Sequence, residues 1–237
     1  MNIKALFLDL DDTLHSFSIS AGTAMNEVYN HMVKKYALPM DRLKQTYAQI
    51  MAQTEKDAFF NGRTSREYRT ERFTKLLTTF NVQDEDLVRE LLDIYSVTLE
   101  GAMVLSEGVG HLLGRLSQKK PLYIVSEGPS DAQRRAIDKL GLATYFQGVF
   151  ISGEAKKIKE TGELFQHALE KTGYKPEEVV LIGDSYARDV VGGLAAGLYV
   201  VWFNRKNEQL NLKDKQPHAQ ISNMQELDGI LEEHFRI

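Results

Sequence analysis

Short, continuously apolar segments recur along the chain, and amphipathic helical patterns separate most of them. The apolar segments predict strands at residues 3–8, 121–125, 148–151, 179–182, 198–203 and 219–222. Helical patterns between and after them lie at 129–140, 160–172, 186–196 and 224–235. Continuously apolar strands that alternate with helices are typical of a parallel sheet covered by helices on both faces. We therefore predict an α/β core with three layers.

Residues 15–104 interrupt this alternation. The stretch contains no convincing strand, and its apolar positions predict amphipathic helices near 19–37, 40–58, 64–80 and 84–99. We interpret it as an all-helical domain inserted between the first strand and the rest of the chain. The predicted division is a Rossmann-like core of residues 1–14 and 105–237, with a helical insert at 15–104.

The composition is that of an ordinary globular protein. Of its 237 residues, 43% are hydrophobic and 26% are charged, which allows a sizeable core. The formal net charge is −4 and no basic tract is present, so nucleic acid is not an expected partner. The absence of cysteine excludes disulfides, thiolate metal sites and a cysteine nucleophile.

No apolar run approaches the roughly 18 residues that a membrane span requires, so we expect no membrane partner. The first residues lead directly into the first strand, without the apolar segment of a signal peptide. We therefore expect a soluble cytoplasmic protein, present as a monomer or homodimer.

Polar side chains follow several of the predicted strands at the point where each strand ends. In an open parallel sheet, ligands bind beyond the carboxyl ends of the strands, so these positions are the candidates for chemistry. They are Asp9, Asp11 and Thr13; Ser126, Glu127 and Gly128; Ser152, Lys156, Lys157 and Lys159; and Gly183, Asp184, Ser185 and Asp189.

Each of these groups alone has an ordinary explanation as a turn, a helix cap or a solvated face. Their coincidence at one sheet edge is harder to explain in that way. Asp9 and Asp184, brought together, would form an oxygen-only site of the kind that Mg²⁺ prefers. The cation would offset the repulsion between the crowded carboxylates. A ligand bound beside a lysine and a serine hydroxyl would then be an anion with several oxygens, and phosphate fits.

These residues, in this order, resemble the motifs of the haloacid dehalogenase (HAD) superfamily over essentially the whole chain. The family's first motif is an apolar strand followed by Asp-x-Asp-x-Thr, here Asp9 to Thr13. The second is a strand that ends in Ser or Thr, here Ser126. The fourth is Gly-Asp with another Asp four or five residues later, here Gly183-Asp184 and Asp189. The resemblance implies the HAD fold, and the helical insert looks like the cap domain of the phosphoglycolate phosphatase-like branch.

The third motif supplies a lysine, about seven residues after a serine and before an apolar–Phe pair. Ser152, Lys159 and Leu164-Phe165 fit this spacing, so Lys159 is our choice, with Lys156 and Lys157 as substitutes. Two positions depart from the family pattern. Glu160 stands where proline is common, and Glu127 places a negative charge near the anion site.

The resemblance implies a mechanism for these residues. Asp9 would attack phosphorus and form an aspartyl-phosphate, and Asp11 would act as general acid and then general base. Mg²⁺ would be bound by the Asp9 carboxylate, the Asp11 carbonyl and Asp184, with Asp189 holding the metal shell or Lys159. Ser126 and Lys159, with Glu127 and Gly128 beside them, would bind the substrate's phosphoryl group.

The resemblance therefore implies a Mg²⁺-dependent phosphatase that acts on a small phosphorylated metabolite. Haloacid dehalogenases of the superfamily generally lack the second Asp, so Asp11 favours phosphate esters. A phosphosugar mutase would use the same aspartyl-phosphate. A catalytically weak binding protein is a further alternative, suggested by Glu127 and Glu160.

In the branch that this chain resembles, substrate specificity comes largely from the insert, and the sequence of the insert is the hardest part to interpret. Arg63, Arg66, Arg69 and Arg72 recur at three-residue intervals, and the ordinary interpretation is a solvated helix face paired with Glu67 and Glu71. The alternative is that Phe59 or Phe60 stacks on a ring beside an arginine. The stretch around residues 59–64 resembles that of nucleoside monophosphate phosphatases, so a nucleoside 5′-monophosphate is our first substrate hypothesis.

The histidines show no short metal-ligand spacing. They stand at positions 15, 31, 111, 167, 218 and 234, and we expect them to be surface or packing residues.

Overall fold

The computed structural model describes residues 2–54, 62–82, 84–211 and 213–237. Within them, a parallel six-stranded sheet has the order β3-β2-β1-β4-β5-β6. Its strands are β1 (Ala5–Leu8), β2 (Leu122–Ser126), β3 (Gly148–Ile151), β4 (Val179–Gly183), β5 (Tyr199–Phe203) and β6 (Ala219–Ile221). Every strand that the apolar segments predicted is therefore present, and the parallel arrangement is confirmed.

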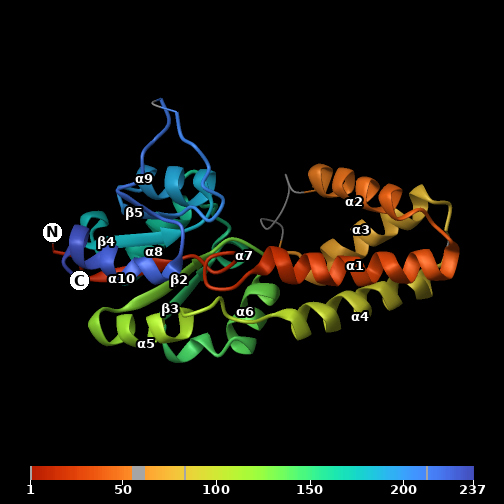
Figure 1. The fold of residues 1–237 in the computed structure, drawn as a ribbon, viewed down its shortest axis with the longest axis horizontal. Coiled ribbons are helices and arrows are strands. Elements are labelled where there is room, and N and C mark those ends of the chain that lie inside the picture. The colour runs from red at the N-terminus through yellow and green to blue at the C-terminus, as the bar shows by residue number, and fades with distance from the viewer. Residues whose placement is uncertain (1, 55–61, 83, 212) are drawn as a thin grey trace.

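Helices cover both faces of the sheet, which explains why its strands are apolar without alternation (Figure 1). In β1, Leu6 and Leu8 belong to the core on one face, and Ala5 and Phe7 to the core on the other. The first face is covered by α5 (Val109–Lys119), α6 (Ser130–Lys139) and α10 (Leu227–Ile230). The second is covered by α8 (Glu163–Thr172) and α9 (Gly192–Ala195). This is the three-layer core that the sequence predicted.

Short helical turns connect or extend these elements. They are Leu142–Thr144, α7 (Ser152–Ala155), Pro176–Glu178, the π-helix Tyr186–Val191 before α9, and Met224–Glu226 and Leu231–Phe235 on either side of α10. The predicted helices at 186–196 and 224–235 are thus each divided into shorter pieces. The helix predicted at 160–172 begins at Glu163, because Gly162 has a φ of 83° and stands in the left-handed region before it.

Among the described residues of the insert between β1 and β2 are four helices, which project from one end of the sheet (Figure 1). They are α1 (Phe17–Tyr36), α2 (Met40–Thr54), α3 (Ser65–Thr79) and α4 (Glu85–Ala102). Helix α1 packs against α4, and α2 packs against α3. None of the described helices combines the length and apolarity needed to cross a bilayer.

One aromatic residue from each of these helices joins a chain of ring contacts inside the insert. The centroids of Tyr29 and Tyr47 are 6.2 Å apart, those of Tyr47 and Phe73 6.1 Å, and those of Phe73 and Tyr95 6.3 Å. Such contacts add to the stability that burial of the rings provides. These ring contacts therefore link all four helices, within the same buried cluster that covers one face of the sheet.

Candidate active site

The predicted residues converge at the carboxyl ends of β1, β2 and β4. Strand β1 lies between β2 and β4, and the chain passes first to β2 and β3 and only later to β4. This reversal of direction leaves a crevice beyond the strand ends, where open α/β sheets bind ligands. The backbone N–H of Asp9 donates to the Ile182 carbonyl at 2.9 Å, which fixes the end of β1 against β4.

Lys159 connects two of the acidic residues in the floor of this crevice. Its side chain is 1% exposed, and its ammonium donates to Asp9 Oδ1 and, at 2.7 Å, to Asp189 Oδ1. Burial alone would lower the pKa of Lys159, but the carboxylates of Asp189 and Asp9 raise it above its usual range. Thr13 Oγ1 donates to the second oxygen of Asp9 at 2.9 Å. Asp9 is thus held on both sides by the chain itself.

Of the three lysines considered from the sequence, the structure brings Lys159 into this cluster. Lys156 is exposed and Lys157 half-buried, and within the described chain neither forms an ion pair with the acids of the crevice.

The acidic residues form a site suited to a hard cation. Carboxylate oxygens of Asp9, Asp184 and Asp189 lie within 4.8 Å of one another. Burial, and then the charges of Asp9, Asp189 and Asp12, raise the pKa of Asp184 to about 7. No described residue donates a hydrogen bond to the Asp184 carboxylate, whereas the two oxygens of Asp189 accept from Lys159 and from the Ser185 N–H at 3.0 Å. An oxygen-only donor set with excess negative charge is what Mg²⁺ requires.

Gly183 is needed for this arrangement, because Asp189 packs directly against it. A Cβ added at position 183 would lie 2.4 Å from the Asp189 Cγ. This distance is too short for two carbon atoms that are not bonded, so a side chain at position 183 would displace Asp189. The Gly-Asp pattern after β4 therefore places both acids together.

Asp11 stands apart from the Asp9–Lys159 cluster and has its own two partners. Its Oδ1 is 2.8 Å from His15 Nε2, and its Oδ2 accepts from Gln133 Nε2 at 2.9 Å. The other end of the same amide, Gln133 Oε1, accepts from Ser126 Oγ at 2.8 Å. A single buried glutamine thus links the side chain that ends β2 to the second aspartate of the first motif.

Neither His15 nor Gln133 was predicted from the sequence to be a site residue. His15 is buried, as a packing residue would be, but its ring also contacts Asp11. A signal for Gln133 lies in Gly128, where an added Cβ would be 2.6 Å from the glutamine Nε2. Gly128 therefore makes room for the amide, a relation that spacing alone does not reveal.

Glu127 is held against the loop that carries Lys159. Its carboxylate accepts the backbone N–H of Lys159 at 2.8 Å, and the N–H of the adjacent Gly128 donates to Ser152 Oγ at 2.8 Å. The negative charge that departs from the family pattern is therefore engaged by the protein backbone, although Glu127 still lines the cavity.

Asp12 has a structural role. It has a φ of 62°, and its carboxylate accepts from the Ser18 N–H at 3.1 Å and from Arg205 at 3.0 Å. These bonds hold the start of α1 beside the end of β1. Asp12 thus lines the same cavity as Asp9 and Asp11, but its carboxylate is bound by the chain turn and Arg205.

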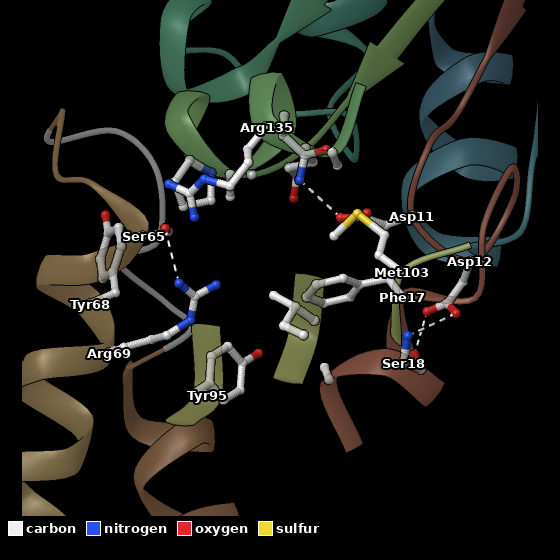
Figure 2. Close-up of a pocket in the computed structure, with 18 of the residues that line it drawn as sticks. Asp11, Asp12, Phe17, Ser18, Ser65, Tyr68, Arg69, Tyr95, Met103 and Arg135 are labelled. Atoms are coloured by element: carbon white, nitrogen blue, oxygen red, sulfur yellow. Dashed lines mark hydrogen bonds between the residues drawn. The ribbon is translucent and has the colours of Figure 1, made fainter. Parts of the chain in front are cut away.

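A cavity of about 500 Å³ extends from these strand ends to the helical insert. Asp9, Asp11, Glu127, Gly128 and Lys159 line one end, and Gln133 and Arg188 lie beside them. The other end is lined from the insert by residues that include Tyr68, Arg69, Arg72 and Tyr95 (Figure 2). The three-residue repeat of arginines was expected to lie on a solvated helix face. Arg63 and Arg66 form ion pairs with Glu71 and Asp93 that fit this expectation, whereas Arg69 and Arg72 reach the cavity. Phe59 and Phe60 lie outside the described residues.

Comparisons with known proteins agree with this geometry. The chain is 26% identical over 234 residues to the N-acylneuraminate-9-phosphatase of Mus musculus, covering 97% of this chain and 94% of that protein. It is 25% identical to the pyrimidine 5′-nucleotidase YjjG of Escherichia coli, covering 97% and 98%. The crystal structure of the HAD-hydrolase YfnB of Bacillus subtilis bound to magnesium superposes with a TM-score of 0.74 at 25% identity, covering 98% and 99%. The model of the haloacid dehalogenase-like hydrolases matches residues 3–197. The chain is therefore an enzyme that belongs to the haloacid dehalogenase-like hydrolase family, with phosphatases among its relatives.

Proposed function

We propose that the protein is a Mg²⁺-dependent phosphatase that hydrolyses small phosphomonoesters through an aspartyl-phosphate on Asp9. The observation that carries this proposal is the environment of Asp9 at the cavity floor. Lys159 and Thr13 hold its carboxylate, while Asp11 stands at the same cavity with separate partners. Two carboxylates in such different surroundings suit two different roles.

The reaction divides into two displacements. An oxygen of Asp9 attacks phosphorus, the bond to the leaving oxygen breaks, and Asp11 gives its proton to that oxygen. Asp11 then takes a proton from a water molecule, which attacks phosphorus and breaks the bond to Asp9. The products are the alcohol and inorganic phosphate, and both carboxyl groups return to their initial states.

The remaining residues would bind and orient. Lys159 would contact phosphoryl oxygens, whereas Ser126, for which the family resemblance implied the same task, is fully buried and donates its hydroxyl to Gln133. Ser126 would therefore hold Gln133, and Gln133 and His15 would hold the Asp11 carboxylate in one orientation. Asp9 and Asp184 would hold Mg²⁺, with the Asp11 carbonyl as a further ligand and Asp189 positioning Lys159. The cation would neutralise charge on the phosphoryl group.

We further infer that residues 15–104 are a cap over the active site. Helices of this unit line the cavity opposite the strand ends, and Ser65 of α3 donates to Asp131 of α6 through its N–H at 2.8 Å and its hydroxyl at 2.7 Å. The cap would exclude water and contact the leaving group. A nucleoside 5′-monophosphate and an N-acylneuraminate 9-phosphate are both candidates, because relatives of this chain act on substrates of these kinds.

The test is phosphate release from p-nitrophenyl phosphate and a panel of nucleotides and sugar phosphates, with Mg²⁺ or with EDTA. We expect turnover with the metal and a loss of about 10⁴-fold or more in Asp9→Asn. Asp86→Asn, at an exposed aspartate of α4, is the matched control. Turnover that persists in EDTA, or an Asp9→Asn enzyme as active as wild type, would contradict the proposal. Chloride release from a haloacid would favour the dehalogenase alternative.

A further inference from the structure

The cap end of the cavity contains two cations, Arg69 and Arg72, that form no ion pair with a carboxylate of the described residues. Arg69 and Arg72 stand three residues apart on α3, so their side chains emerge close together, and both are half-buried at the cavity wall. Figure 2 shows the Arg69 guanidinium pointing into the cavity, with Asp11 and Asp12 on the far side.

The partners of both guanidinium groups are neutral. Arg69 donates to Ser65 Oγ at 3.0 Å and lies 4.6 Å from the centroid of the Tyr95 ring. Arg72 donates to Thr54 Oγ1 at 3.0 Å and lies 6.0 Å from that of Tyr68. Within the described chain, neither forms an ion pair with a carboxylate, although Arg63 and Arg66 of the same segment both do. A guanidinium has more N–H donors than these contacts use.

The carboxylates nearest to this end of the cavity are already matched. Asp131 accepts from the Ser65 N–H and hydroxyl and from Arg135 at 3.3 Å. Glu100 lies 3.8 Å from the same Arg135. Among the described residues, Asp131 and Glu100 therefore pair with Arg135, and the charges of Arg69 and Arg72 at the cavity wall have no carboxylate partner there.

Between the two charged ends, the cavity wall is largely apolar. Phe17 and Met103 lie between Arg69 and Asp11 in Figure 2, and Met25 and Leu99 also line the cavity. Such a wall lowers the local dielectric constant and strengthens an ionic contact made there. It also suits the carbon skeleton of a substrate that carries polar groups at its two ends.

We propose that Arg69 and Arg72 form a subsite for a second anionic group, a carboxylate or a second phosphate, at the leaving-group end of the substrate. The planar guanidinium donates two parallel hydrogen bonds to either group. The inference rests on the proposed phosphatase function and narrows it to phosphomonoesters of acids, or to bisphosphates. A pyrimidine 5′-monophosphate without an acid group on its base leaves this subsite without a counter-charge.

The experiment compares kcat/KM within pairs of substrates that differ in the second anion. Glucitol 6-phosphate is paired with gluconate 6-phosphate, uridine 5′-monophosphate with orotidine 5′-monophosphate, and fructose 1-phosphate with fructose 1,6-bisphosphate. The first two pairs test a carboxylate, and the third tests a phosphate. We expect wild type to favour the more anionic member of at least one pair by roughly 10- to 100-fold, the value of a charged hydrogen-bonded contact.

The arginines are then replaced one at a time. Arg69→Gln and Arg72→Gln should each reduce that preference at least tenfold, mainly through KM. Arg66→Gln, on the same helix but paired with Asp93 outside the cavity, should retain it. Equal kcat/KM values within every pair in wild type would overturn the subsite. Variants in which kcat/KM falls by the same factor for both substrates of a pair would overturn it as well. The wild-type comparison does not depend on how the variants fold.

The result is separable from that of the proposed function. If the enzyme hydrolyses p-nitrophenyl phosphate with Mg²⁺, loses this activity in Asp9→Asn, and still shows equal kcat/KM values within every substrate pair, the subsite alone is refuted. If no phosphate ester is hydrolysed, the proposed function fails and the subsite fails with it.

Discussion

The two ends of the cavity differ in how their charges are satisfied. At the strand ends, Asp9 and Asp189 share the buried Lys159, and both oxygens of Asp11 have partners. At the cap end, Arg69 and Arg72 have only neutral partners within the described chain. These groups thus hold one another without help from a ligand, as preorganised electrostatic catalysis at the proposed reacting end requires. The cap end leaves charge for a substrate to complete.

Asp184 is the exception at the strand ends, and it marks where a ligand other than the substrate is expected. No described residue donates a hydrogen bond to its carboxylate, and its pKa is raised to about 7. The guanidinium of Arg188 offsets part of the repulsion around Asp184, but three carboxylates with oxygens within 4.8 Å of one another still favour a further positive charge at this position.

The largest effect should come from breaking the buried cluster. Lys159→Met removes the ammonium and leaves two buried carboxylates facing each other, so we expect a loss of about 3–5 kcal/mol in the free energy of unfolding. Urea denaturation measures it, with activity lost in parallel. Lys157→Met, two residues earlier and outside the cluster, is the control. A Lys159→Met protein as stable as wild type would show that the strand ends are not preorganised by this lysine.

Magnesium should stabilise the protein in a pH-dependent manner. Without the metal, the pKa of Asp184 is about 7 in the folded state and near its ordinary 3.8 when unfolded. The folded state therefore binds the proton more tightly, so this group's contribution to stability falls as pH rises from about 4 to about 7. Mg²⁺ competes with that proton and should stabilise more at pH 8 than at pH 5.5.

Thermal unfolding with and without Mg²⁺ measures this difference. At a concentration a hundred times Kd, the gain is about 2.7 kcal/mol, or roughly 5–10 °C for a chain of this size. Asp184→Asn should lose both the metal effect and its pH dependence. A gain of equal size at pH 5.5 and pH 8 in wild type would argue against Asp184 as a metal ligand.

Much of the strand-end site was predictable because chain direction determines it. A residue that follows a parallel strand must lie at the carboxyl edge of the sheet, so the positions of Asp9, Ser126 and Asp184 followed from the apolar segments. Gln133 was not predictable in this way. It lies one helical turn into α6, and its role depends on which face of that helix meets Asp11.

The cap arginines were less predictable for a geometric reason. Residues three apart on a helix are offset by about 60° around its axis, so a three-residue repeat cannot stay on one face. Neighbouring arginines of the repeat stay close, but the turn adds up to about 120° between Arg66 and Arg72, and the boundary between exterior and cavity falls between Arg66 and Arg69. The packing of α3 on its neighbouring helices determines which arginines face the cavity, and the sequence does not specify that packing.

A smaller effect is expected from the glutamine that joins Ser126 to Asp11. Gln133→Leu leaves the Ser126 hydroxyl and one Asp11 oxygen without these partners, so we expect kcat to fall about 10- to 100-fold. KM for p-nitrophenyl phosphate should change less, because the residue positions the acid–base group and does not contact the phosphoryl group. Gln166→Leu, on the exposed side of α8, is the control. An unchanged kcat would show that Gln133 does not position Asp11 for the reaction.

The smallest effect separates an exterior ion pair of the cap from the buried cluster. Arg66 and Asp93 are 3.6 Å apart with side chains 57% and 70% exposed, so water and salt screen them. Asp93→Asn should lower the free energy of unfolding by less than about 0.5 kcal/mol, and by less still in 1 M NaCl. Asp189→Asn, in contact with the buried Lys159, should cost several times more and respond little to salt. If the two variants lost equal stability, burial would not distinguish the charges at the strand ends from those on the cap, and the contrast between the two regions would fail.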